Sequence, residues 1–200
     1  IDQSTGYVVA VMGGRGTKEG RLTLNRATDT VRQPGSTFKI VSTYAPALDS
    51  AGMNLATVFN DAPFNYQDGK GKPVTNANNK YDYKTLSIRE AIIRSKNTIA
   101  VKTLTQITPQ LGFDYLLNFG FTTMVEGKWV NGQWFTDIMQ PTALGGITDG
   151  VKNIELCAAY ASIANEGAYI EPKLYTKVLD SNGNVLLDNT SPRSRQVIKP

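Results

Sequence analysis

The sequence predicts a mixed α/β (α+β) fold, and three observations carry that prediction. Apolar residues recur at helical spacing in several segments, the last of them near residues 153–165. Asn-Gly pairs at Asn131-Gly132 and Asn182-Gly183 stand between strand-like segments, as they do in β-hairpins. The chain has 200 residues, 40% of them hydrophobic, which suits one domain, or a large part of one, with a substantial core.

The first predicted element is a strand at Tyr7–Met12, after a turn at residues 3–6. Gly13-Gly14-Arg15-Gly16 follows it but does not match a dinucleotide-binding fingerprint. Glu19 stands where the third glycine is required. The sequence therefore indicates a loop at this point and no cofactor.

A buried helix is predicted to begin near Ser36, directly after the break made by Pro34 and Gly35. The residues that follow are apolar on most sides: Phe38, Ile40, Val41, Tyr44, Ala45, Ala47 and Leu48. Residues 54–84 are rich in Asn, Gly, Lys and Tyr and are predicted to form long surface loops that line a site.

Two helices are predicted in the next segment, one through Ile88 and Ile92 and one through Ile99 and Leu104, with Ser95-Lys96-Asn97 at their junction. A third is predicted to begin near Pro109 and to end before Gly120. A hairpin at residues 128–135, the helix near 153–165 and a strand pair around Asn182-Gly183 complete the series.

Composition excludes several classes of function. The net charge of +4 is modest and the basic residues are scattered, so nucleic-acid binding is not indicated. The segment has no histidine, which excludes a Ser-His-Asp mechanism and a His-ligated metal within it. The lone Cys157 is predicted to be a buried small hydrophobe without a disulfide partner. No apolar run is long enough to span a membrane, and no segment resembles a signal peptide.

The stretch "RQPGSTFK" places Lys39 three residues after Ser36. Ser36 could be a helix cap, but a capping box requires Glu or Gln at the position of Lys39, and a cation is unfavourable in the first turn. Residues at i and i+3 share a helix face, so Lys39 can reach the Ser36 hydroxyl. Burial favours a neutral amine, which could accept the proton of a serine nucleophile. The spacing alone is weak because short motifs match by chance.

A second motif is Ser95-Lys96-Asn97, which contains the only S-x-N of the chain, just as Ser36 begins the only S-x-x-K. A hydroxyl and an amide at a helix junction suit a proton relay and the orientation of substrate. By itself the motif would be interpreted as a loop serine and a helix-capping asparagine.

Together and in this order, the two motifs resemble those of penicillin-binding proteins, in the serine β-lactamase and transpeptidase superfamily. The resemblance to the transpeptidase domain of the class A, bifunctional type extends over most of the chain. The similar stretches are "STGYVVAVMGG", "LNRATDTVRQPGSTFK", "TLSIREAIIRSKN" and "LGGITDGVKNIELCAAYASIANEG".

The resemblance implies a central antiparallel sheet flanked by helices, with a mostly helical subdomain. It implies that Ser36 is the acylated nucleophile, that Lys39 is the general base, and that Ser95 and Asn97 relay protons and orient substrate. The substrates implied are a peptidoglycan stem peptide ending in D-Ala-D-Ala and an amine acceptor stem, with β-lactam antibiotics as inhibitors. The family further implies an upstream glycosyltransferase domain and a location at the outer face of the bacterial membrane, anchored by a segment outside this chain.

One departure concerns the third family motif, Lys-Thr/Ser-Gly. Both Lys-Thr pairs of this chain, Lys84-Thr85 and Lys102-Thr103, are followed by leucine. We therefore expect residues 1–200 to be the N-terminal and central part of the domain, with the third motif on a strand after Pro200.

Three alternatives remain open. A D,D-carboxypeptidase would pass the acyl group to water, and sequence alone distinguishes it poorly from a transpeptidase. A β-lactamase would need a group that activates water, and Glu171 in "EPKLY" matches the lactamase pattern only superficially, because Tyr175 replaces its asparagine. A sensor domain would bind β-lactams without turnover.

Overall fold

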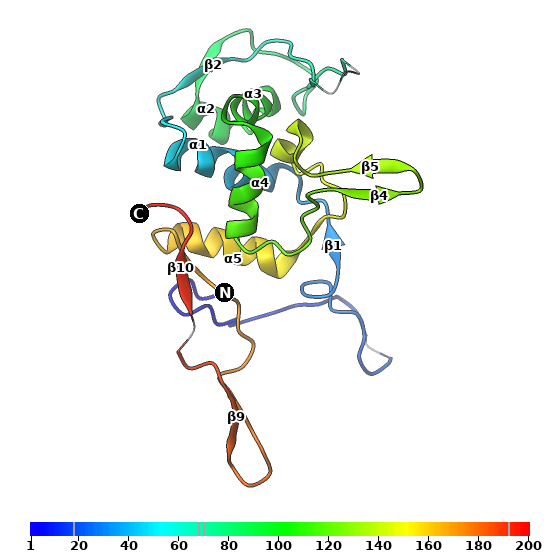
Figure 1. The fold of residues 1–200 in the computed structure, drawn as a ribbon, viewed down its shortest axis with the longest axis vertical. Coiled ribbons are helices and arrows are strands. Elements are labelled where there is room, and N and C mark those ends of the chain that lie inside the picture. The colour runs from blue at the N-terminus through cyan, green and yellow to red at the C-terminus, as the bar shows by residue number, and fades with distance from the viewer. Residues whose placement is uncertain (18, 68, 70, 192) are drawn as a thin grey trace. The chain divides into compact units, whose positions relative to one another are not determined.

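The computed structural model describes residues 1–17, 19–67, 69, 71–191 and 193–200 (Figure 1). The chain forms two compact units, each described here by itself. The first unit comprises Ile1–Arg32, Phe119–Phe121 and Val151–Pro200, and the second comprises Gln33–Asn118 and Thr122–Gly150. All four predicted site residues therefore belong to the second unit.

The helix predicted from Ser36 is confirmed as helical, but its winding changes twice. A 3-10 turn, η1 (Gly35–Thr37), leads into a π-helical turn, η2 (Ile40–Tyr44), and then into α1 (Ala45–Asp49). Phe38, Val41 and Tyr44 are buried, as the apolar pattern predicts. Irregular helical turns of this kind are frequent at functional sites.

The three helices predicted between residues 88 and 120 are also confirmed. α2 (Ile88–Ile93) begins with a capping box between Ser87 and Glu90, α3 (Asn97–Ile107) follows, and α4 (Pro109–Asn118) begins at its proline. They enclose the core of the second unit, formed by Tyr44, Ala47, Val74, Leu86, Ile88, Ala91, Ile99, Ala100, Val101, Leu104, Ile107 and Ala143.

Two small antiparallel sheets and a 3-10 helix complete the second unit. β2 (Val58–Asn60) pairs with β3 (Thr85–Ser87), and β4 (Lys128–Val130) pairs with β5 (Gln133–Phe135). The second pair confirms the predicted hairpin: Asn131 and Gly132 both have positive φ, 51° and 78°, as a type I′ turn requires. η3 (Gln140–Leu144) follows.

The prediction of surface loops over residues 54–84 is only partly right. Apart from β2, most of this stretch is irregular, but Asp61, Val74 and Asn76 are buried. Polar composition conceals this burial, because Asp61 and Asn76 are buried with hydrogen-bond partners rather than exposed to water.

In the first unit, β1 (Val31–Arg32) pairs with β6 (Val151–Lys152), and α5 (Asn153–Ala164) follows β6. β7 (Ala168–Ile170) pairs with β10 (Ser194–Gln196). β8 (Lys177–Leu179) pairs with β9 (Val185–Asp188). The predicted helix at residues 153–165 and the strand pair around Asn182-Gly183 are thus confirmed.

Two predictions for the first unit are wrong. Tyr7–Met12 is not a strand: Tyr7 forms an isolated bridge with Lys173, and among the described residues no strand runs beside Val9 and Met12, which are exposed. Cys157 is exposed, not buried. The segment around it is apolar on all sides, so the sequence could not indicate which face of α5 would be covered; the structure buries Ala158 and Ala159.

The described strands form five two-stranded antiparallel sheets. The central sheet implied by the family resemblance is therefore not assembled by the part of the chain that the structure describes.

Candidate active site

Ser36 is the middle residue of η1 and is exposed. Two glycines restrict the turn that carries Ser36, one within the turn and one packed against it. Gly35 has a φ of +59°, and Gly145 lies so close to it that a Cβ on Gly145 would stand 2.4 Å from the Gly35 nitrogen. A larger residue at Gly145 would require the backbone to shift, and one at Gly35 would have room for its side chain but a strained left-handed backbone.

Gln33 adds a polar tie beside this turn. Its Oε1 accepts from the Ile147 N–H at 2.9 Å, and its Nε2 donates to the Ile147 carbonyl. The segment Gly145–Ile147 therefore supports the turn that presents Ser36. The sequence contains this contact only as "LGG", which gives no sign of what the glycines pack against.

Lys39 lies one turn after Ser36 and is buried, with 2% of its surface exposed. Its Nζ donates to the Ser95 carbonyl at 2.7 Å, to Ser95 Oγ at 2.8 Å and to Asn97 Oδ1 at 2.6 Å. All three partners are neutral oxygens. Burial lowers the pKa of Lys39 from 10.5 to about 8, as expected for an ammonium group removed from water without a carboxylate to compensate it.

The structure thus brings Lys39, Ser95 and Asn97 together, as the two motifs predict. It does not join Ser36 to them, because Ser36 Oγ is not among the hydrogen-bond partners of Lys39 in the described residues. Three donated bonds use every proton of an ammonium group. A neutral Lys39 keeps two N–H donors and must release one oxygen when its lone pair turns to Ser36.

The second motif lies on a sharp turn between α2 and α3. Ser95 has a φ of +50°, and the Ser95 and Lys96 N–H groups donate to the Ile92 and Ala91 carbonyls. These are the two bonds of a Schellman motif, whose left-handed position normally holds glycine. A serine there is a strained residue at a candidate site, and its carbonyl and hydroxyl both face Lys39.

Asn97 is held by residues that the sequence analysis did not identify. Its Nδ2 donates to the Thr75 carbonyl at 2.8 Å, and its backbone N–H donates to Asn76 Oδ1 at 2.9 Å. Both partners belong to the stretch assigned to surface loops. No periodicity or motif could have revealed them, because the contact joins residues about twenty positions apart through an irregular segment.

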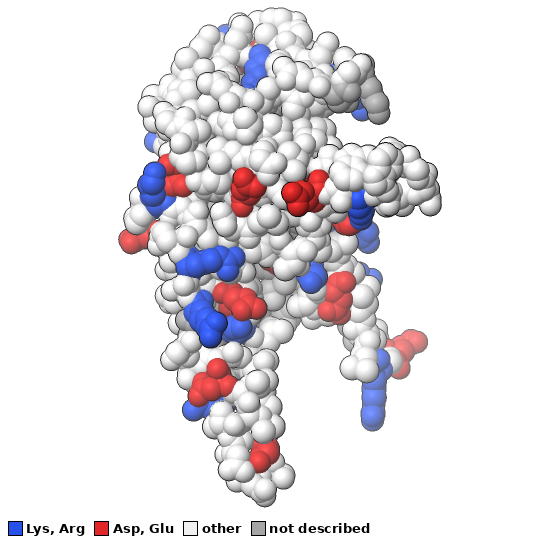
Figure 2. Space-filling model, in the orientation of Figure 1, with Lys and Arg blue, Asp and Glu red and all other residues white. Residues whose placement is uncertain are grey.

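Within the described residues, no group of three or more His, Cys, Asp or Glu side chains could hold a metal ion. None of the described helices is long and apolar enough to cross a bilayer. On the face shown in Figure 2, Lys and Arg lie among Asp and Glu. Glu171, the residue considered for a β-lactamase, is exposed and paired with Lys173 at 3.0 Å.

The whole chain, residues 1–200, matches the model of the penicillin binding protein transpeptidase domain. The protein belongs to this family, as the two motifs and their surroundings predict.

The relatives are of the predicted class. Penicillin-binding protein 1A of Clostridium tetani is 35% identical over 202 residues, covering 98% of this chain and 25% of the relative. Penicillin-binding protein 1A of Clostridium novyi is 37% identical, covering 100% of this chain and 23% of the relative. The chain thus spans about a quarter of the length of these curated relatives.

Among solved structures, PonA1 of Mycobacterium tuberculosis in complex with penicillin V is similar with a TM-score of 0.80 and 25% identity. The match covers 100% of this chain and 50% of that one. The mixed α/β fold of the transpeptidase family is thereby confirmed for this protein.

Proposed function

We propose that the chain carries the nucleophile, general base and relay of a peptidoglycan D,D-transpeptidase. The observation that carries the proposal is the position of Lys39: a buried lysine with a lowered pKa, hydrogen-bonded to Ser95 and Asn97 and one turn from Ser36. Relatives named penicillin-binding protein 1A and a similar structure with penicillin V support it.

In the proposed first step, Ser36 Oγ attacks the carbonyl carbon of the D-Ala-D-Ala peptide bond while its proton passes to the neutral Lys39 amine. The tetrahedral intermediate breaks its C–N bond, and the terminal D-alanine leaves with a proton delivered through Ser95. The stem peptide remains as an ester on Ser36. Asn97 holds Lys39 and orients the substrate amide.

In the second step, the amine of a neighbouring stem attacks the ester carbonyl. Its proton passes to the Lys39–Ser95 pair and then to Ser36 Oγ as the ester C–O bond breaks. Ser36 and the neutral lysine are regenerated, and a new peptide bond cross-links the two stems. A β-lactam would acylate Ser36 in the same way, but the nitrogen freed when its ring C–N bond breaks would stay covalently attached to the acyl group and would not depart as D-alanine does.

The remaining partners follow the family. We propose action at the outer face of the bacterial membrane, in a protein with a membrane anchor and a glycosyltransferase domain, and residues 1–200 as the N-terminal and central part of the transpeptidase domain. A D,D-carboxypeptidase would use the same residues with water as acceptor. A β-lactamase is less well supported, because Glu171 is exposed and ion-paired.

Peptide mapping by mass spectrometry after exposure of the full-length protein to penicillin tests the nucleophile. We expect the adduct on Ser36 and complete loss of labelling in Ser36→Ala. Ser181→Ala is the control, because this exposed serine precedes the Asn182-Gly183 turn and has no lysine three residues on. An adduct on another residue, or full labelling of Ser36→Ala, would refute the assignment.

Incubation with a stem peptide, with and without an amine acceptor, separates the alternatives. A transpeptidase yields the cross-linked product, whereas a carboxypeptidase yields only the shortened stem and free D-alanine. A sensor retains the penicillin adduct and turns over neither substrate.

A further inference from the structure

A buried carboxylate, that of Asp61, contacts the Ser95–Asn97 turn through Lys96. Asp61 is fully buried, and four groups donate to it: Lys96 Nζ at 2.9 Å, Asn76 Nδ2 at 2.9 Å, the Asp82 N–H at 3.0 Å and Thr98 Oγ1. Burial alone acts to raise the pKa of Asp61, but the bonds from Thr98, Lys96 and Asn76 outweigh it and hold the pKa well below its usual range. Asp61 is therefore an anion at neutral pH.

This carboxylate is linked, directly or through Asn76, to each of the three residues that follow Ser95. Lys96, the central residue of the motif, pairs with Asp61 and also with Asp82 at 2.7 Å. Asn76, held by Asp61, accepts from the backbone N–H groups of Asn97 and Thr98 through its Oδ1. Residues 96, 97 and 98 thus each have a bond to Asp61 or to Asn76.

Asn76 also completes the start of α3. The first N–H groups of a helix have no partner within it, and Lys96, at the capping position, supplies no side-chain bond. Asn76 Oδ1 provides the missing acceptor from a distant loop, as a capping side chain would. Asp61 and the Lys80 carbonyl together fix the orientation of this amide, because both can accept only from its Nδ2.

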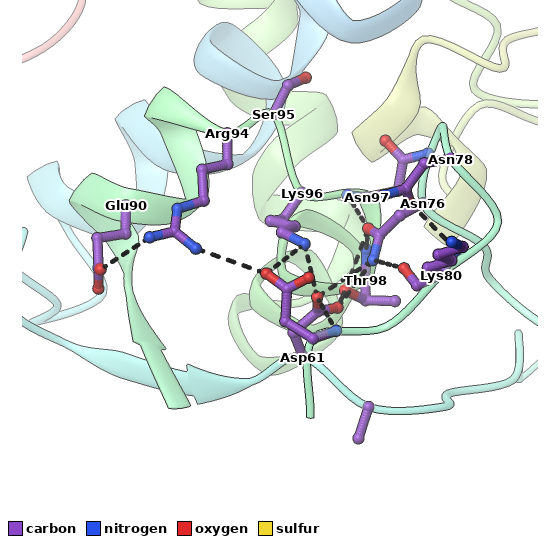
Figure 3. A network of polar contacts seen from close by, with 12 residues as sticks. Asp61, Asn76, Asn78, Lys80, Glu90, Arg94, Ser95, Lys96, Asn97 and Thr98 are labelled. Carbon is purple, nitrogen blue, oxygen red and sulfur yellow. Dashed lines mark hydrogen bonds and ion pairs between the residues drawn. The ribbon is translucent and has the colours of Figure 1, made fainter. Parts of the chain in front are cut away.

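The turn consequently has two functional sides. Figure 3 shows Lys96 pointing toward Asp61 and Ser95 pointing the opposite way. Ser95 carries a positive φ, and the anchored residues on its C-terminal side hold it in that conformation. A shift of this turn would displace both oxygens of Ser95 and the Asn97 amide from Lys39.

We infer that Asp61, acting through Lys96 and Asn76, is a positioning residue that holds Ser95 and Asn97 within hydrogen-bonding distance of Lys39. The expected effect of Asp61 on the acylation rate rests on the proposed function. Its expected effect on the hydrogen bonds around Lys39 does not. Asp61 touches none of the reacting groups.

The test measures penicillin acylation of Ser36 in the full-length protein carrying Asp61→Asn. This change keeps the shape of the side chain and removes the charge of one of the two carboxylates that pair with Lys96, leaving Asp82. A misplacement of catalytic groups by about 1 Å can cost on the order of 10²-fold. We expect a rate loss of about 10–100-fold in the folded protein, with the adduct still on Ser36.

A second readout does not depend on acylation. The rate at which acetic anhydride modifies Lys39, followed by mass spectrometry, reports how tightly Ser95 and Asn97 enclose its amine. We expect Lys39 to be protected in the wild type and several-fold more reactive in Asp61→Asn. If the wild type forms no adduct on Ser36, the proposed function fails, while this protection still tests the positioning.

Two controls separate positioning from stability. Ile107→Ala truncates a buried side chain at the far end of α3 and destabilises the same unit without touching the turn. Asp49→Asn removes a carboxylate that accepts from Tyr115 at the end of α1. Both should retain the wild-type acylation rate per folded molecule and the protection of Lys39.

If Asp61→Asn fails to fold, Lys96→Met provides a second variant. In Lys96→Met, Asp61 keeps three of its four hydrogen-bond donors. This variant should show the same loss of rate and protection, and Lys96→Arg should restore both in part. Wild-type acylation and protection in folded Asp61→Asn or Lys96→Met would overturn the inference. So would a loss no greater than that of Ile107→Ala at equal folded fraction.

Discussion

Lys39 and Lys96 are two buried lysines of one unit, the first contacting the Ser95–Asn97 turn and the second belonging to it, yet their surroundings differ in charge. Lys39 is 2% exposed and donates only to neutral oxygens, whereas Lys96 is 7% exposed and pairs with Asp61 and Asp82. Burial lowers the pKa of Lys39 to about 8. Burial also acts to lower the pKa of Lys96, but its bonds to Asp82 and Asp61 outweigh it and raise the pKa.

The comparison shows that burial alone does not make a lysine a base. The charge of the partners decides, because a carboxylate stabilises the ammonium form and a carbonyl or amide oxygen does so far less. Lys39 can supply a neutral amine near neutral pH, while Lys96 is a permanent cation that anchors the turn. In the proposed mechanism Lys39 is therefore the base, whereas Lys96 anchors the turn that carries Ser95 and Asn97.

The largest expected effect comes from making Lys39 a permanent cation. Lys39→Arg cannot yield a neutral base near pH 7, and general-base help is typically worth roughly 10²–10⁴ in rate. We expect a loss of acylation in this range with the fold retained, measured with a fluorescent penicillin. Lys102→Arg is the matched control, because Lys102 is also partly buried and donates to the Asn60 and Ala62 carbonyls. Normal acylation of Lys39→Arg would reduce Lys39 to a packing or electrostatic role.

The candidate site residues of the two motifs could be proposed from the sequence because each motif is local, and their roles stay predictions. The spacing of Ser36 and Lys39 places them on one helical turn, and the uniqueness of Ser95-x-Asn97 indicates a partner motif. The contacts beneath the turn could not be predicted, since Asp61 and Asn76 lie in an irregular polar stretch whose composition is that of a surface loop. Their burial depends on the tertiary position of Lys96 and Thr98.

The fold shows the same contrast: elements with local sequence signals could be predicted, and features that depend on tertiary contacts could not. Helices and hairpins with local signals were found at their positions, such as α4 after Pro109 and the turn at Asn131-Gly132. The strand at Tyr7–Met12 was wrong because a strand requires a neighbour, which a local pattern cannot supply. The prediction that Cys157 is buried was wrong, because a helix that is apolar on all sides does not show which of its faces is covered.

A smaller effect is expected when Lys39 is given the kind of partner that Lys96 has. Asn97→Asp places a carboxylate where Asn97 Oδ1 lies 2.6 Å from Lys39 Nζ. An adjacent opposite charge raises a lysine pKa by roughly 1–3 units, so we expect acylation at pH 7 to fall by about 10–10³-fold.

The pH profile distinguishes this cause from a loss of substrate contacts. For the wild type, acylation should rise about tenfold per pH unit and level off near the Lys39 pKa of about 8, because only the neutral amine reacts. In Asn97→Asp the plateau should move to higher pH, and the rate should recover there. A variant that is slow at every pH with an unchanged midpoint would show that Asn97 acts on the substrate alone.

The smallest expected effect is on stability, and here the two lysines should have opposite signs. The folded protein holds Lys39 at a pKa of about 8 against 10.5 for the unfolded chain, so below pH 8 its burial as a cation opposes folding, and this penalty fades between pH 8 and 10.5. Lys39→Met should therefore raise the free energy of unfolding at pH 7 by about 1–3 kcal/mol, while it lowers acylation as Lys39→Arg does. Lys96→Met should lower it by about 1–3 kcal/mol, since Asp61 loses its buried cation.

Urea unfolding of both variants at pH 7 and at pH 9.5 measures the difference. The gain of Lys39→Met should shrink at the higher pH, because the wild-type lysine is then largely neutral in the folded state. The loss of Lys96→Met should persist there, because the carboxylates keep Lys96 charged. Equal and pH-independent losses in both variants would mean that the two lysines differ in position but not in charge state, and the division between base and anchor would fail.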